Sequence, residues 1–165
     1  MTYQLLPIPL SQLRELAIPI APTTLGFDVE GEALPPAFVA AASLELIEVQ
    51  GAPAWCCTYY ILRCSDMRIV GSGCFKRTPY LNSVEIGYGI VPTARNSGAA
   101  TQAVKDFVSL AFRNGLVCVT AEVTPENLAS IKVLEKAGFS CVGSRVDDED
   151  GLVQQWAVAK DASAR

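Results

Sequence analysis

The chain has 165 residues, of which 50% are hydrophobic and 18% are charged, and its formal net charge is −4. This length and apolar content suit one folded domain and exclude a disordered or a highly charged chain. The acidic balance argues against nucleic acid as the main partner, because phosphate binding needs clustered Lys and Arg. The sequence contains no His, so imidazole catalysis and His-ligated zinc are excluded.

The amino-terminal segment is apolar but is not typical of a secretion signal. It lacks a basic leading region, and Arg14, Glu15 and several prolines interrupt it. No run approaches about 18 uninterrupted apolar residues, so no membrane span is expected. The six cysteines form no C-x-x-C pair and are expected to be free thiols. These features predict a soluble, cytoplasmic protein with no metal site and no membrane partner.

The first half of the chain changes from helical to strand-like patterns. One short helix is expected after Ser11 and a longer one near Pro36, with a loop between them. Residues 55–64 and 67–77 then predict a hairpin of two strands, and residues 84–91 predict a third strand.

The second half alternates helices and strands. Apolar residues at helical spacing from Ala100 to Ala111 predict a helix that ends at Gly115. The remaining segments predict a strand, a helix and a hairpin around the acidic turn DEDG, at residues 116–123, 125–138, 139–147 and 152–159. This order predicts a single α/β domain.

The stretch VPTARNSGAATQAV (residues 91–104) has few large side chains between a strand and a helix. Small residues let backbone N–H groups approach a ligand, and the first N–H groups of a helix have no intrahelical partner. The helix dipole also favours an anion at this end. The stretch therefore predicts a seat for pyrophosphate that needs neither Lys nor metal, and a tight packing turn is the alternative.

Two segments, VEIGYGIVPTARNSGAATQAV and AEVTPENLASIKVLEKAGF, resemble in this order the core of the GCN5-related N-acetyltransferases (GNAT). The nearest branch is that of the ribosomal-protein N-terminal acetyltransferases and related small-molecule acetyltransferases. The acetyl-CoA loop of the superfamily, Q/R-x-x-G-x-G/A, is matched by Arg95, Gly98 and Ala100. The resemblance covers residues 84–143, with weaker support from residues 68–75.

The resemblance implies one N-acetyltransferase domain over residues 1–165. Its fold class is α/β (α+β), with a mixed, mostly antiparallel sheet of six or seven strands flanked by helices. The central fourth and fifth strands are expected to splay and admit acetyl-CoA. Residues 55–160 would form the core motif region, and residues 1–54 a strand and helix region that shapes the acceptor site.

The resemblance also implies cofactor-binding residues. The backbone of Ile90 and Val91 is expected to pair with the pantetheine arm of acetyl-CoA. Asn127 and Ser130 match an Asn-x-x-Ser element that contacts the cofactor, although Asn127 could be only the N-cap of its helix. The pyrophosphate is expected on the backbone amides of Arg95, Asn96, Ser97, Gly98, Ala99 and Ala100. Ser97 replaces the common Arg or Lys, which predicts modestly weaker binding.

The implied reaction is direct attack of a neutral primary amine on acetyl-CoA, without metal or acyl-enzyme. The acceptor could be a protein N-terminus or a small-molecule amine. Since the substrate ammonium must first lose a proton, Glu122 or Glu85 could act as the base, directly or through water, or be no more than a sheet carboxylate. Leu134 occupies the position of the usual acid Tyr, which leaves water or another tyrosine such as Tyr88.

A catalytically weak acyl-CoA-binding sensor or structural module is the alternative function, and the missing Tyr at position 134 supports it. A monomer and a homodimer are both compatible with the sequence. The acceptor depends on the first fifty residues and on the loop TPYLNS, which carry no recognised motif.

Overall fold

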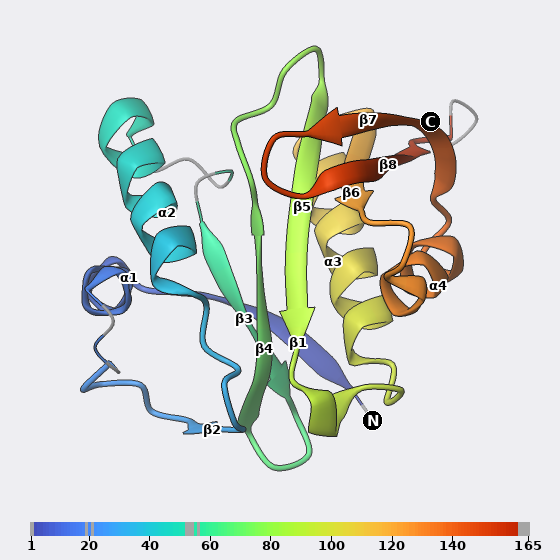
Figure 1. Cartoon of the computed structure of the whole chain (residues 1–165). Coiled ribbons are helices and arrows are strands. Elements are labelled where there is room, and N and C mark those ends of the chain that lie inside the picture. The colour runs from blue at the N-terminus through green and yellow to red at the C-terminus, as the bar shows by residue number, and fades with distance from the viewer. Residues whose placement is uncertain (1, 19, 21, 52–54, 56, 162–165) are drawn as a thin grey trace.

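A mixed sheet of eight strands runs through the protein in the order β1-β3-β4-β5-β6-β8-β7, with β2 beside β4 (Figure 1). The computed structural model describes residues 2–18, 20, 22–51, 55 and 57–161. The strands are β1 (Tyr3–Pro7), β2 (Asp28–Val29), β3 (Thr58–Arg63), β4 (Arg68–Phe75), β5 (Ser83–Ile90), β6 (Cys118–Val123), β7 (Ser140–Asp147) and β8 (Gly151–Ala159). The helices are α1 (Leu10–Ala17), α2 (Ala37–Gln50), α3 (Ala99–Arg113) and α4 (Leu128–Lys136), and a 3-10 turn spans Pro92–Ala94.

The predicted fold class is confirmed, with one difference in the number of strands. Two strands in the first thirty residues raise the expected six or seven to eight. β1 ends at Pro7 and shows no clear alternation, and β2 has only two residues, so neither carries a period-two signal. Their pairing with β3 and β4 depends on strands far along the chain.

Aromatic packing holds helix α3 against strands β3 and β4 of the sheet. The ring of Phe107 lies edge-to-face on Tyr59 and Phe75, with centroid distances of 5.4 and 5.2 Å. Gly73 on β4 allows this approach, since a Cβ atom there would lie 2.8 Å from Cε2 of Phe107. The packing fixes the helix, and therefore fixes where its amino-terminal end meets the sheet.

The expected splay lies between β5 and β6, which are the fifth and sixth strands because β2 adds one. They pair in parallel over three residues only, from Ser83↔Cys118 to Glu85↔Thr120. Beyond this point β5 stays with β4, and β6 stays with β8. Since each half of the sheet follows its own antiparallel partner and twist, the two strands diverge and leave an open edge on β5.

Helices α1 and α2 pack against each other at the opposite side of the sheet from the β7–β8 hairpin (Figure 1). In the described part of the chain, no helix is long and apolar enough to cross a membrane. The described cysteines are free thiols, while Cys56 lies outside the described residues. The division into residues 1–54 and 55–160 and the cytoplasmic location stay predictions.

Candidate active site

Two cavities meet where β5 and β6 diverge. The first, here called the loop groove, has a volume of about 450 Å³ and lies between residues 88–90, residues 94–101 and residues 127–136. The second, here called the hairpin cavity, has a volume of about 560 Å³ and is lined from β5, β6, the segment after β4 and the β7–β8 hairpin. Both are lined by Tyr88, Asn127 and Ser130.

The amino-terminal end of α3 opens into the loop groove. Gly98 has a φ angle of +88°, the left-handed region that glycine adopts without strain, and no side chain caps the helix. The first bond of the helix runs from the Gln102 N–H to the Gly98 carbonyl at 2.9 Å. The N–H groups of Ala99, Ala100 and Thr101 therefore have no partner within the helix, which is the arrangement that binds anions.

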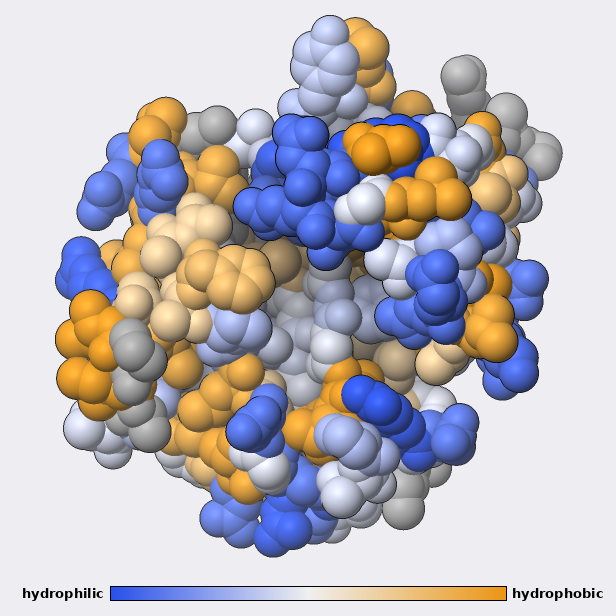
Figure 2. Space-filling view, in the orientation of Figure 1, coloured by the Kyte–Doolittle hydropathy of each residue, from blue (hydrophilic) through white to orange (hydrophobic). Residues whose placement is uncertain are grey.

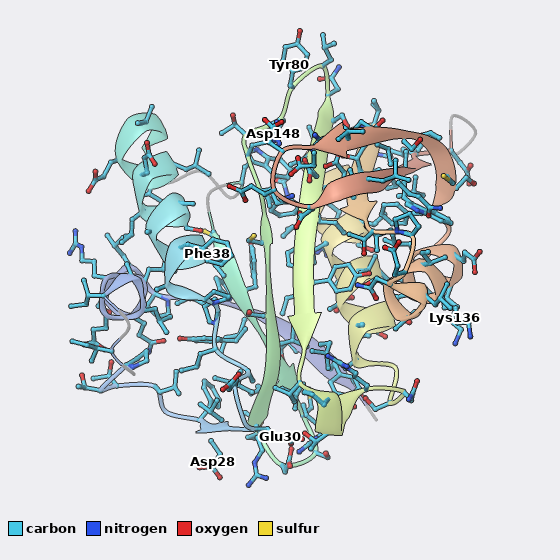
Figure 3. All side chains as sticks on the ribbon, viewed as in Figure 1. Asp28, Glu30, Phe38, Tyr80, Lys136 and Asp148 are labelled. Atoms are coloured by element: carbon cyan, nitrogen blue, oxygen red, sulfur yellow. The ribbon has the colours of Figure 1, made fainter. Side chains whose placement is uncertain are left out.

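Cationic side chains add positive charge to the loop groove. Arg95, Lys132 and Lys136 line the groove, and no carboxylate is among its described lining residues. Lys132 and Lys136 are one helical turn apart on α4, and Figure 3 shows Lys136 at the outer end of that helix. Neither lysine was predicted as a site residue, although their four-residue spacing before Gly138 is visible in the sequence.

Ser97 does not line the loop groove. Its hydroxyl donates to the Ala94 carbonyl, which turns the side chain back into the loop. The neighbouring predicted positions Arg95, Asn96 and Gly98 do line the groove. The cationic charge that Ser97 lacks is therefore present on another element, helix α4.

The two predicted pantetheine partners, Ile90 and Val91, differ in orientation. The Val91 N–H donates to the Val70 carbonyl of β4 at 3.0 Å, and the Val91 side chain is 6% exposed in the core. Backbone groups alternate along a strand, so the N–H of Ile90 points to the open edge instead. Ile90 lines the groove, whereas Val91 does not, because its N–H is already used within the sheet.

Asn127 caps helix α4. Its Oδ1 accepts a hydrogen bond from the Ser130 N–H at 3.1 Å, so the N-cap interpretation is confirmed. The helix begins at Leu128, after a turn over residues 125–127. Asn127 and Ser130 also line both cavities, and their contact with a cofactor stays a prediction.

Tyr88 lies on β5 where the two cavities join. Its hydroxyl oxygen is buried, and no described residue makes a hydrogen bond to it. Burial raises the pKa of Tyr88 above its usual value, although the nearby Ser130 side chain opposes this rise. A buried hydroxyl without a partner costs about 1–3 kcal/mol, so a bound molecule with an acceptor atom would satisfy it.

Glu122 projects from β6 into the hairpin cavity. Arg145 donates to both of its oxygens, through Nε at 2.8 Å and Nη2 at 2.6 Å, and Gln155 donates at 3.2 Å. The hydrogen bonds from Arg145 hold the pKa of Glu122 below its usual value, although burial acts in the opposite direction. The same guanidinium contacts Asp147 at 2.7 Å. The sequence carried no signal for Arg145.

Glu85 lies at the closed end of the splay. It pairs with Thr120 in the last β5–β6 pair, and its carboxylate binds Lys76 at 2.7 Å and Arg77 at 3.3 Å. Glu85 is not among the residues that line either cavity. The strands separate only after this residue, and the role of Glu85 as a base stays a prediction.

The hairpin cavity has the opposite charge to the loop groove. Five carboxylates and three cations line it, namely Glu122, Asp147, Asp148, Glu149, Asp150, Lys76, Arg77 and Arg145. Figure 2 shows hydrophilic side chains gathered around this hairpin turn, and Figure 3 shows Asp148 at the turn itself. Leu134, 1% exposed, lines the same cavity and supplies no hydroxyl.

No group of three or more Cys, Asp or Glu side chains that could hold a metal ion occurs among the residues described. A reaction without metal therefore stays a prediction from the sequence.

A family model described as an acetyltransferase (GNAT) domain matches residues 36–140. A search of curated proteins found no match. Among solved structures, an acetyltransferase of the GNAT family from Bacillus anthracis is 22% identical, with a TM-score of 0.55 over 62% of this chain and 65% of that chain.

Two further structures resemble nearly the whole chain. A ribosomal-protein-S5-alanine acetyltransferase from Vibrio fischeri is 16% identical, with a TM-score of 0.70 over 98% of this chain and 95% of that chain. An aminoglycoside acetyltransferase in complex with coenzyme A is 15% identical, with a TM-score of 0.65 over 96% and 95%. At these identities the likeness is one of fold. The family model matches well over half of the chain, and the protein therefore belongs to the acetyltransferase (GNAT) domain family.

Proposed function

We propose that this protein transfers an acetyl group from acetyl-CoA to a primary amine by direct attack of the amine on the thioester. The observation that carries the proposal is the meeting of two cavities of opposite charge at the β5–β6 splay. One suits an anionic donor molecule and the other a cationic acceptor. The reaction needs both molecules to reach one point.

The loop groove fits the phosphates of acetyl-CoA. Helix α3 offers free N–H groups at Ala99 and Ala100, and its dipole favours an anion there by about 0.3–1 kcal/mol when exposed and up to ~2 when partly buried. Lys132 and Lys136 add positive charge beside it. The open edge of β5 at Ile90 can pair with an extended pantetheine arm as an added strand would.

The hairpin cavity fits the amine. Its excess of carboxylates attracts an ammonium group and disfavours anionic acceptors. Glu122 is the better-placed candidate base, because Glu85 lines neither cavity. Since Arg145 occupies both oxygens of Glu122, the proton of the ammonium would pass to this carboxylate through water or after the arginine moves.

The proposed acceptors include both proteins and small molecules. The two full-length relatives are named for acetylating ribosomal protein S5 and aminoglycosides, one a protein and the other a small molecule with several amines. A protein N-terminus and a small-molecule amine are therefore both proposed. The acidic turn at residues 147–150 favours acceptors with an additional positive charge.

Thiol release from acetyl-CoA, measured with a panel of amines, tests this function. The panel should include peptides with free N-termini, diamines, polyamines and aminoglycosides, with calorimetric titration of acetyl-CoA alongside. Turnover of any amine supports the proposal. Tight binding of acetyl-CoA with no turnover of any amine would instead support the acyl-CoA sensor.

A further inference from the structure

The cavities identify where the reacting atoms must lie. A donor that binds in the loop groove and an acceptor that binds in the hairpin cavity can meet only where the two join. The side chains common to both cavities are Tyr88, Asn127 and Ser130. The carbonyl carbon and the sulfur of the thioester therefore belong beside these three side chains.

Among the three shared side chains, the Tyr88 hydroxyl is the polar group that is buried without a partner among the described residues. Asn127 is exposed and its Oδ1 accepts from the Ser130 N–H, while Ser130 is only partly buried, so water can reach the remaining donors of both residues. Leu134, which lines the adjoining wall, has no polar atom. The Tyr88 hydroxyl is buried without a hydrogen-bonding partner in the described structure. It can therefore donate a hydrogen bond to an acceptor atom of a bound ligand.

We propose that the Tyr88 hydroxyl donates a hydrogen bond to the sulfur of CoA and stabilises the negative charge that develops there. The inference rests on the proposed function. The amine nitrogen forms the bond to the carbonyl carbon, the carbon–sulfur bond breaks, and its electron pair goes to sulfur. The nitrogen loses its proton to water on the Glu122 side, and the thiolate takes a proton from solvent.

Tyr88 keeps its own proton throughout this step. A thiol ionises near pH 8.5 and a phenol near pH 10, so the thiolate is the weaker base of the two. Burial raises the pKa of Tyr88 further. The phenol therefore acts as a fixed donor, in the way that preorganised donors stabilise developing charge in other active sites.

The direct test is the titration of CoA bound to the wild type and to Tyr88→Phe. Thiolate absorbance is followed against pH, with the CoA-free protein subtracted. Without the donor, the bound thiol should ionise about one to two pH units higher, as expected for one lost hydrogen bond to a charged group. The control, Tyr80→Phe, removes a phenol from a side chain that is 75% exposed and lines neither cavity, and it should leave the ionisation of bound CoA unchanged.

Kinetics and stability provide independent readouts. The kcat of Tyr88→Phe should fall about 10- to 100-fold with little change in the KM for acetyl-CoA. Its thermal unfolding temperature should stay at or above that of the wild type, because the lost hydroxyl has no partner. The shape of the pH–rate profile should also be kept.

Several outcomes would overturn the inference and leave the proposed function intact. They are equal ionisation of bound CoA in both proteins, a raised KM with unchanged kcat, or loss of an alkaline limb in the pH profile of the variant. Failure of the wild type to bind CoA would contradict the proposed function itself. The two failures are therefore distinguishable.

Discussion

The loop groove and the hairpin cavity share one wall but are built in different ways. The groove uses backbone N–H groups and side chains from three short segments, residues 88–90, 94–101 and 127–136. The cavity uses side chains from β5, β6, the segment after β4 and the β7–β8 hairpin. A site made by the backbone of a local motif can be read from the sequence, whereas one made by dispersed side chains needs the fold.

The largest expected effect is a loss of acetyl-CoA affinity when a side chain is added at the amino-terminal end of helix α3, but not at its other end. Gly98→Val should abolish measurable acetyl-CoA binding, a loss of at least about 100-fold, because a branched side chain at a positive φ displaces the N–H groups around it. Gly115→Val is the matched control, since Gly115 has a φ angle of +86° at the other end of the same helix. Calorimetric titration should show near-normal affinity for the control, and equal losses in both variants would contradict the assignment of the groove.

Glu122, which lines the hairpin cavity, and Glu85, which does not, should differ in their effect on turnover. Glu122→Gln should lower kcat about 100-fold, at the low end of the range for general acid–base catalysis, without weakening acetyl-CoA binding. Glu85→Gln should change kcat less than about threefold, because Glu85 lines neither cavity. Steady-state kinetics on the best amine measures both, and a larger loss in the Glu85 variant would reverse the two roles.

Charge reversal on each side should affect one ligand only. Lys136→Glu should weaken acetyl-CoA binding about 10-fold at low salt and less at high salt, because the contact is exposed and screened. Asp148→Lys should lower kcat/KM for a diamine by about three- to tenfold and leave acetyl-CoA affinity unchanged. If either variant altered both ligands equally, the two cavities would not be separate binding sites.

The smallest expected effect is on stability. Because Arg145 depresses the pKa of Glu122, this carboxylate stabilises the folded protein above the ordinary carboxyl pKa. That stability is lost as the pH falls through the lowered pKa. Arg145→Gln should therefore unfold at lower urea concentration than the wild type at pH 7, and the difference should shrink in acid. A difference that grows in acid would contradict this linkage.

Much of the fold was predictable because its signals are local. Periodicity and Gly138 located helix α4, and strand-like runs bounded by turn and loop residues located β3, β4 and β5. A strand was expected within residues 1–54, but the position of β1 was not predicted, because its pairing with β3 spans more than fifty residues. Packing across the sheet, such as Phe107 against Gly73, is equally invisible along the chain.

In the candidate site, too, some residues could be identified from a local motif, whereas others depend on how distant strands pair. Gly98, Ala100 and Asn127 were identified from a motif, and they line the loop groove as expected. Val91 and Glu85 line neither cavity, because the Val91 N–H bonds to β4 and the strands part only after Glu85, and their predicted roles stay predictions. Arg145 was not foreseen, because only the return of β7 beside β8 and β6 brings it to Glu122.

The sequence by itself determined the family resemblance and the order of helices and strands. It also determined the small-residue loop before helix α3, because these features depend on residues that are neighbours in the chain. The tertiary structure decided which carboxylate faces the splay, which lysines reach the groove and that Tyr88 stands unpartnered between the cavities. Those contacts arise where two halves of a twisted sheet diverge, and no local pattern specifies that point.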